Sequence, residues 1–138
     1  MDGFDYSKPD AKDLMHIAEC FASSGRDVVL LKPIHYKSVE YIQVYGPLMG
    51  TRYERKCPDL MIDGQYYEYE SYTRPWRKRK LSNMITSGLR QSDRIILDNR
   101  DGVSIRQINR AIRARLNINA QIKEVWVYDG DSIVEVYP

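Results

Sequence analysis

The sequence has few of the residues that build disulfide frameworks or zinc sites. Its 138 residues include two cysteines and two histidines. Cys20 and Cys57 show no metal-ligand spacing, which excludes a disulfide-rich scaffold and favours a reducing compartment. His35 has no second histidine or cysteine close by in the sequence, and His16 lies beside the apolar stripe of a predicted helix. A zinc site is therefore not expected.

Long apolar runs and nucleophile motifs are also missing. No segment approaches the ~20 apolar residues that a membrane span needs, so no membrane partner is expected. The first ten residues are acidic and polar and do not resemble a signal peptide, which favours action in the cytoplasm. Ser82, Ser87 and Ser92 have no histidine or aspartate at the spacing of a catalytic triad.

Charge is distributed unevenly although the net charge is only +2. Residues 1–73 hold 8 Lys and Arg against 12 Asp and Glu, whereas residues 74–115 hold 12 Lys and Arg against 3 Asp. A solvated helix face normally mixes charges of both signs, so this segment indicates a polyanionic partner, namely nucleic acid. Trp76 lies among these cations, where it could stack on a base or cap the core. The predicted contacts are Arg74, Trp76, Arg77, Lys78, Arg79, Lys80, Arg106, Arg110 and Arg113.

Apolar periodicity predicts an α+β domain over residues 11–138, preceded by an N-terminal arm over 1–10. Within it, residues 34–57 form a predicted insertion, in which 38–45 is read as a strand. In the last helix, Ile105, Ile108, Ala111 and Ile112 are expected to face inward. The other predicted elements are helices over 11–24, 77–91 and 103 or 104 to 116, and strands over 27–31, 60–62, 65–72, 93–98, 122–128 and 132–137.

A predicted hairpin carries the most informative carboxylates. Asp59 precedes its first strand, Asp63 and Gly64 form its turn, and Glu68 and Glu70 alternate along its second strand. Exposed strands often carry glutamates toward solvent, so a structural role is the simplest reading of the spacing alone. If the three carboxylates instead meet at one point, their mutual repulsion requires a cation, and their hard oxygens suit Mg²⁺ or Mn²⁺.

The helix over 77–91 begins with four cations, Arg77 to Lys80. Because the helix dipole favours anions at this end, a phosphate ligand explains the placement better than helix stability does. The basic helix therefore follows directly on the acidic hairpin, as a site for a divalent ion and a phosphodiester would require.

The order helix-strand-strand-strand-helix-strand, with Pro-Asp before one strand and glutamate on the next, resembles the PD-(D/E)xK nuclease superfamily. More narrowly, the runs V-V-L-L, K-C-P-D-L-M-I-D-G-Q-Y-Y-E-Y-E-S and R-I-I-L-D are similar to the C-terminal tRNase domain of CdiA-type contact-dependent inhibition toxins. The resemblance implies a restriction-endonuclease-like core, in which helices flank a mixed sheet, with an added C-terminal helix and β-hairpin. It also implies an immunity protein as partner and a larger secreted or mobile-element parent protein.

The resemblance further implies the roles of individual residues. Asp59 and Glu68 match the metal-ligating acids, Glu19 lies where some members supply a further carboxylate, and Gln91 matches a glutamine at the end of the second helix. Glu70 occupies the position of the motif's catalytic lysine. The residues expected to replace that lysine are Lys78, Lys80 and Lys56.

Three functions follow. The first is a metal-dependent endonuclease that uses Mg²⁺ or Mn²⁺, with tRNA favoured over DNA as substrate. The second is an inactive nucleic-acid-binding module on the same fold, which the glutamate at position 70 supports. The third is a metal-independent ribonuclease of the barnase or EndoU kind. The sequence leaves the oligomeric state open.

Overall fold

A computed structural model of the chain describes residues 4–73, 75–118 and 120–138. A six-stranded sheet forms its centre, with the strands in chain order from β1 to β6. β3 pairs in parallel with β4 and β4 with β5, whereas the other neighbours are antiparallel. The elements are α1 (Ala11–Ser23), β1 (Val28–Leu30), α2 (Val39–Tyr45), the 3₁₀ helix η1 (Gly46–Leu48), β2 (Leu60–Ile62), β3 (Gln65–Glu70), α3 (Lys78–Leu89), β4 (Arg94–Asp98), α4 (Ile105–Leu116), β5 (Glu124–Tyr128) and β6 (Ile133–Tyr137). The predicted α+β class and the closing hairpin are confirmed.

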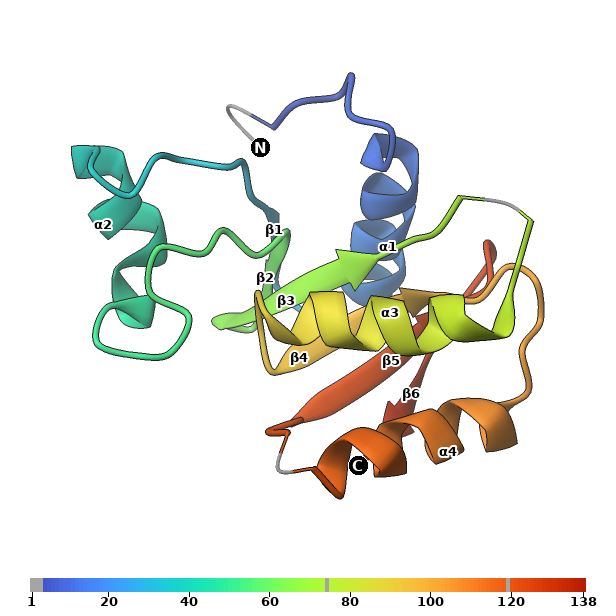
Figure 1. Cartoon of the computed structure of the whole chain (residues 1–138). Helices are drawn as coiled ribbons and strands as arrows, with labels where there is room; N and C mark the ends of the chain where they lie inside the picture. The colour runs from blue at the N-terminus through green and yellow to red at the C-terminus, as the bar shows by residue number, and fades with distance from the viewer. Residues whose placement is uncertain (1–3, 74, 119) are drawn as a thin grey trace.

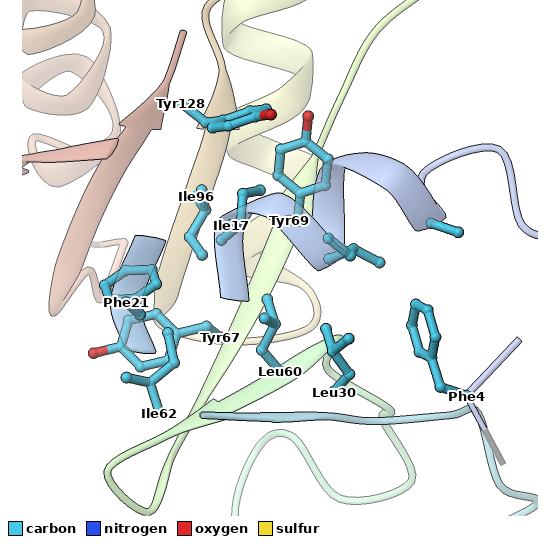
Figure 2. Packing of buried hydrophobic residues seen from close by; sticks show 12 residues of the cluster. Phe4, Ile17, Phe21, Leu30, Leu60, Ile62, Tyr67, Tyr69, Ile96 and Tyr128 are labelled. Carbon is cyan, nitrogen blue, oxygen red and sulfur yellow. The ribbon is translucent and has the colours of Figure 1, made fainter. Parts of the chain in front are cut away.

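Helix α1 covers one face of the sheet, whereas α3 and α4 cover the other (Figure 1). Leu14, Ile17 and Phe21 recur at helical spacing and place one stripe of α1 on the sheet. Tyr67 and Tyr69 of β3 point toward the same face and are 1% and 2% exposed (Figure 2). Since strand side chains alternate, the neighbouring Glu68 and Glu70 point toward the α3 face.

The β3 tyrosines are buried on both faces of the strand, Tyr67 and Tyr69 against α1 and Tyr66 against α2. Tyr66, Tyr67 and Tyr69 are all buried. They are core side chains and form no exposed surface on which a base could stack. The strand ends at Glu70, two residues earlier than predicted.

Residues 39–45 form helix α2, so the prediction of a strand there is wrong. Tyr41 and Tyr45 are four residues apart and therefore share one helix face, which is fully buried. Their rings stack on each other and on Tyr66, and Tyr45 donates a hydrogen bond of 2.7 Å to the carbonyl of Lys32. β-branched and aromatic residues gave this segment a strand-like composition, but burial of the tyrosine face favours the helix. In Figure 1, α2 lies to one side of the sheet.

Helix α4 begins at a capping box, in which Gln107 donates its backbone N–H to the Ser104 hydroxyl at 3.2 Å. Ile108 and Ile112 are buried as predicted, but Ile105 is 44% exposed, so its predicted inward position is wrong.

Gly88 allows α3 to lie directly on β3 and β4. A Cβ atom at this position would meet Ile95 Cγ2 at 3.0 Å and Glu70 Cγ at 3.1 Å. We expect Gly88→Ala to destabilise the protein by about 1–2 kcal/mol, because overpacking outweighs the gain of about 1 kcal/mol in helix propensity. Urea unfolding measures this difference, with Ser82→Ala on an exposed position of the same helix as control. A Gly88→Ala protein more stable than wild type would contradict the close packing.

Candidate active site

Asp59 and Glu68 come together on the α3 side of the hairpin. The antiparallel register pairs Leu60 with Tyr67, which puts Asp59 opposite Glu68. The carboxylate of Asp59 accepts the Tyr69 backbone N–H at 2.9 Å, and Asp59 and Glu68 also share a side-chain hydrogen bond. The sequence prediction that these two acids meet is therefore confirmed.

The carboxyl pair is electrostatically unfavourable without a cation. Burial is the largest cause that raises the pKa of Glu68, followed by the negative charges of Asp59 and Glu70. Burial also raises the pKa of Asp59. One oxygen of Glu68, Oε1, is buried without a hydrogen-bond partner. Burial and mutual repulsion therefore favour a proton or a cation between the two carboxyl groups.

Glu70 lies next to this pair but is turned toward α3. Its carboxylate has a hydrogen bond with Ser87, which lowers its pKa, while burial is the larger effect and raises the pKa overall. Its charge still acts on Glu68. Of the three carboxylates expected to meet at one point, Asp59 and Glu68 do so, whereas Glu70 lies beside them.

The donor set at this point consists of two carboxylates. Within residues 4–73, 75–118 and 120–138, no three histidine, cysteine or acidic side chains are grouped so that they could hold one. Two carboxylates with an unpartnered buried oxygen nevertheless suit Mg²⁺, which commonly binds through one or two carboxylates and keeps several waters. Asp59 and Glu68 are therefore the residues that would hold it.

A further carboxylate near Asp59 and Glu70 belongs to Asp10, the N-cap residue of α1. It precedes the helix, accepts a hydrogen bond of 2.9 Å from the Ser71 hydroxyl, and raises the pKa of both Asp59 and Glu70. Glu19 is exposed nearly three turns further along and acts on the Cys20 thiol instead. The predicted position of Glu19 beside the metal ligands is therefore wrong.

The other predicted catalytic residues lie elsewhere. Gln91 follows α3 and lines an open pocket of about 630 Å³ with Tyr66 and Lys123. Lys78 is exposed and lines a groove between α3 and α4. Lys80 lines the same groove as Glu70, but its Nζ donates to the carbonyl of Pro75 at 2.7 Å and to that of Thr73.

A basic surface runs over α3 and α4. Arg106, Arg110 and Arg113 share the exposed side of α4, as predicted. Arg110 also lines the α3–α4 groove of about 210 Å³, together with Lys78 and Trp76. Trp76 is half-buried and packs against the core on this face, which confirms one of its two predicted roles. Stacking on a base stays a prediction. Arg77 and Arg79 are exposed at the start of α3, and Arg74 lies outside the described residues.

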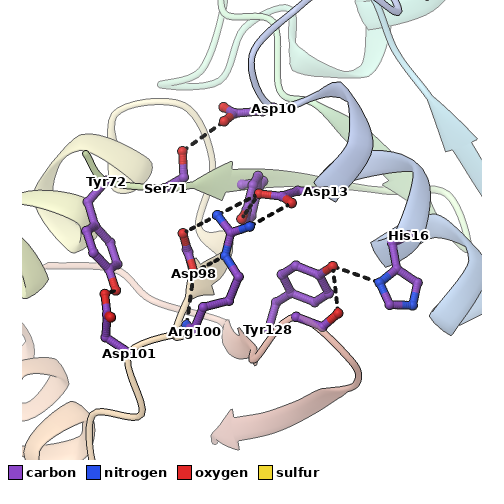
Figure 3. Close-up of polar contacts among 11 residues, drawn as sticks. Asp10, Asp13, His16, Ser71, Tyr72, Asp98, Arg100, Asp101 and Tyr128 are labelled. Carbon is purple, nitrogen blue, oxygen red and sulfur yellow. Dashed lines mark hydrogen bonds and ion pairs between the residues drawn. The ribbon is translucent and has the colours of Figure 1, made fainter. Parts of the chain in front are cut away.

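A second polar cluster, which the sequence analysis missed, joins α1 to the end of β4 (Figure 3). Arg100 bonds Asp98 through Nε at 3.1 Å and Nη2 at 2.9 Å, and also pairs with Asp13 at 3.1 Å. Tyr69 donates to the same Asp13 carboxylate at 2.9 Å. Hydrogen bonding to Asp98 raises the pKa of Arg100. This cluster fixes the tyrosine between the two acids of β3.

His16 shows why a lone histidine was a poor ligand candidate. Its Nδ1 lies 2.7 Å from the Tyr128 hydroxyl, which donates in turn to the Gly130 carbonyl at 3.2 Å (Figure 3). His16 is thus half-buried and packed against Tyr128. His35 is exposed and stacks on Tyr36. Both cysteines are free thiols.

Comparison with known proteins shows the family and the fold of the chain. Residues 56–134, more than half of the chain, match the family model described as contact-dependent growth inhibition CdiA C-terminal domain. The solved structure of the CdiA-CT/CdiI toxin and immunity complex from Burkholderia pseudomallei contains a similar chain, with a TM-score of 0.56 and 20% identity over 99% of this chain and 91% of that one. This likeness shows a shared fold. No curated protein sequence matches.

Proposed function

Because the chain belongs to the family of CdiA C-terminal domains of contact-dependent growth inhibition, we propose that it is a toxin domain that hydrolyses phosphodiester bonds of nucleic acid with a bound Mg²⁺ or Mn²⁺. The observation that supports this activity is the pairing of Asp59 with Glu68, whose Oε1 is buried and unpartnered. The wider relationship to the PD-(D/E)xK superfamily remains part of the proposal.

A divalent ion between these carboxylates would lower the pKa of bound water and neutralise charge that develops on the scissile phosphate. The protein residues have two tasks in this proposal. Asp59 and Glu68 hold the ion, and the Tyr69 backbone N–H fixes the Asp59 carboxylate at 2.9 Å. In the hydrolysis, an oxygen of water bonds to phosphorus, one ester P–O bond breaks, and the leaving oxygen takes up a proton.

The start of α3 provides a place for the substrate phosphates. Its N-cap residue, Arg77, is extended and has no side-chain capping bond, and the first turn carries no acidic residue. Free backbone N–H groups and cations at a helix N-terminus favour phosphate. Trp76 lines the groove beside the first turns of α3, whereas Glu70 contacts Ser87 and Gly88 in its last turn. A nucleic-acid strand would therefore have to run along α3 to contact both.

Cleavage assays test the proposal directly. Total tRNA and plasmid DNA are incubated with the protein and with Mg²⁺, Mn²⁺ or EDTA, beside Asp59→Ala and Glu68→Ala variants. We expect cleavage that requires the ion and both acids, with tRNA as the preferred substrate. Cleavage in EDTA would indicate the metal-independent ribonuclease, and salt-dependent binding without cleavage would indicate the inactive module suggested by Glu70.

The basic groove makes a separate quantitative prediction. In a Glu68→Gln background, Lys78→Gln and Arg110→Gln are each expected to reduce the slope of log affinity against log salt by about 1, because each removes one phosphate contact. Fluorescence anisotropy with labelled tRNA measures the slope. Lys37→Gln, an exposed cation in the insertion, is the control and leaves the slope unchanged. Equal slopes for all variants would exclude the groove from the binding surface.

The family also suggests a parent protein and a binding partner for this chain. We propose that the chain acts as part of a larger secreted protein and is neutralised by an immunity protein, as the described complex of the similar toxin suggests. In the described part of the chain, every helix is too short or too polar to cross a bilayer. Co-expression that restores growth of cells producing the active domain would identify the immunity protein.

A further inference from the structure

The candidate site has no obvious basic residue on the elements that carry its acids. Glu70 stands where the resemblance places a lysine. Lys78 lines a different groove, and Lys80 is bound to two backbone carbonyls. A phosphodiester that enters beside Asp59 and Glu68 would therefore meet three acids unless a cation comes from elsewhere in the chain.

The segment before α1 is anchored at two points, and the second of them lies beside the end of β3. Phe4 is 6% exposed and packs in the core beside Leu30 (Figure 2). Asp10 accepts the Ser71 hydroxyl at 2.9 Å, immediately after the end of β3 (Figure 3). Lys8 lies in the turn between these two anchors, and its carbonyl accepts the Ala11 backbone N–H at 3.0 Å.

The ammonium group of Lys8 acts on both metal-site acids. Its charge lowers the pKa of Asp59 and of Glu68, against the larger effects of burial. The side chain is half-buried, and none of the ion pairs found among the described residues involves it. The geometry agrees with this effect, because Asp10 is held at Ser71, two residues beyond the Tyr69 that binds Asp59, and Lys8 precedes Asp10 by two residues. The charge of Lys8 also acts on Asp5.

We propose that Lys8 is a catalytic residue of this site and supplies the cation that β3 lacks, by donating hydrogen bonds to the scissile phosphate. This inference rests on the proposed nuclease function. A lysine acts on phosphate as a flexible point charge, so a different segment can deliver it if the ammonium reaches the same place. In the hydrolysis described above, Lys8 keeps its proton and stabilises the charge on the non-bridging oxygens.

Lys8→Met, Lys8→Gln and Lys8→Arg test the proposal, with Lys12→Met as a matched control on the exposed side of α1. We expect Lys8→Met and Lys8→Gln to lower kcat for tRNA cleavage about 100-fold, and Lys8→Arg to retain an intermediate rate. Lys12→Met keeps the wild-type rate. Calorimetry with Mn²⁺ provides the second measurement: the affinity of Lys8→Met stays equal to that of wild type or increases, because a positive charge near the ion is removed.

The outcomes separate the two proposals. If wild type cleaves, Asp59→Ala does not, and Lys8→Gln cleaves within about threefold of wild type, the nuclease function stands and the role of Lys8 is overturned. If Lys8→Met and Lys8→Gln lose Mn²⁺ binding together with activity, Lys8 is structural and the proposal is also overturned. If wild type does not cleave, both proposals fail. Circular dichroism of Lys8→Gln checks that its fold is intact.

Discussion

Glu68→Gln is expected to abolish cleavage and to stabilise the fold at the same time. Loss of a metal-ligating carboxylate should reduce the cleavage rate by about 10³-fold or more. Stability should increase because the neutral amide fills the same space, while the ionised glutamate is disfavoured by burial and by Asp59. Glu68, a ligand of the proposed metal ion, is thus predicted to lower the free energy of unfolding of the metal-free protein.

The pH dependence follows from the raised pKa. The pKa of Glu68 rises from 4.5 to about 10, so the folded protein holds a proton that the unfolded chain releases above pH 4.5. Stability from this group is complete below pH 4.5 and decreases as the pH rises toward 10. The advantage of Glu68→Gln over wild type should therefore increase from pH 5 to pH 9, within that range.

Thermal unfolding of both proteins across this pH range, in EDTA, measures the effect. Added Mn²⁺ should stabilise wild type more strongly as the pH rises, because ion binding replaces the shared proton. Glu68→Gln should respond little. Glu135→Gln, an exposed glutamate on β6, is the control and should match wild type throughout. A Glu68→Gln protein less stable than wild type at pH 8 would contradict the electrostatic description.

Arg100→Met is expected to have the largest effect on stability. Asp98 has a fully buried side chain that Arg100 neutralises through two hydrogen bonds. Removing the guanidinium leaves a buried carboxylate without its partner, and loss of one member of such a pair costs about 3 kcal/mol. The midpoint of thermal unfolding should fall by on the order of 10 °C.

A second substitution separates charge from packing. In Arg100→Met/Asp98→Asn the buried charge is gone, so we expect a substantial part of the lost stability to return. Arg113→Met, an exposed arginine on α4, should stay within about 0.5 kcal/mol of wild type. If Arg100→Met unfolds like the Arg113→Met control, the cluster does not contribute to stability.

The network around Arg100 also bears on the site. Tyr69 lies between Glu68 and Glu70 in β3, and its hydroxyl is held by Asp13 at 2.9 Å. Its backbone N–H holds Asp59 at 2.9 Å. The side chain of Tyr69 therefore belongs to the Arg100 cluster, while its backbone N–H belongs to the candidate active site.

Local patterns in the sequence were sufficient to predict most of the helices and strands and the pairing of Asp59 with Glu68. Alternation along residues 65–70 puts Glu68 on one face and Tyr67 and Tyr69 on the other, and the Asp63-Gly64 turn sets the register that brings Asp59 opposite Glu68. These relationships involve neighbours in the chain or across a single turn. For that reason, composition and spacing alone predicted the hairpin, the basic helices and the closing strands.

Contacts between distant segments were decided only by the tertiary structure. The helical state of residues 39–45 depends on a tyrosine face that packs on Tyr66, and Arg100 meets Asp13 across 87 positions of the chain. Asp10 rather than Glu19 lies near Asp59 and Glu70, because the contacts of Phe4 with the core and of Asp10 with Ser71 determine where the N-terminal arm lies. The same contacts determine the position of Lys8 in that arm. No local periodicity records such long-range packing, so the sequence by itself could identify the acids of the site but not the cation that accompanies them.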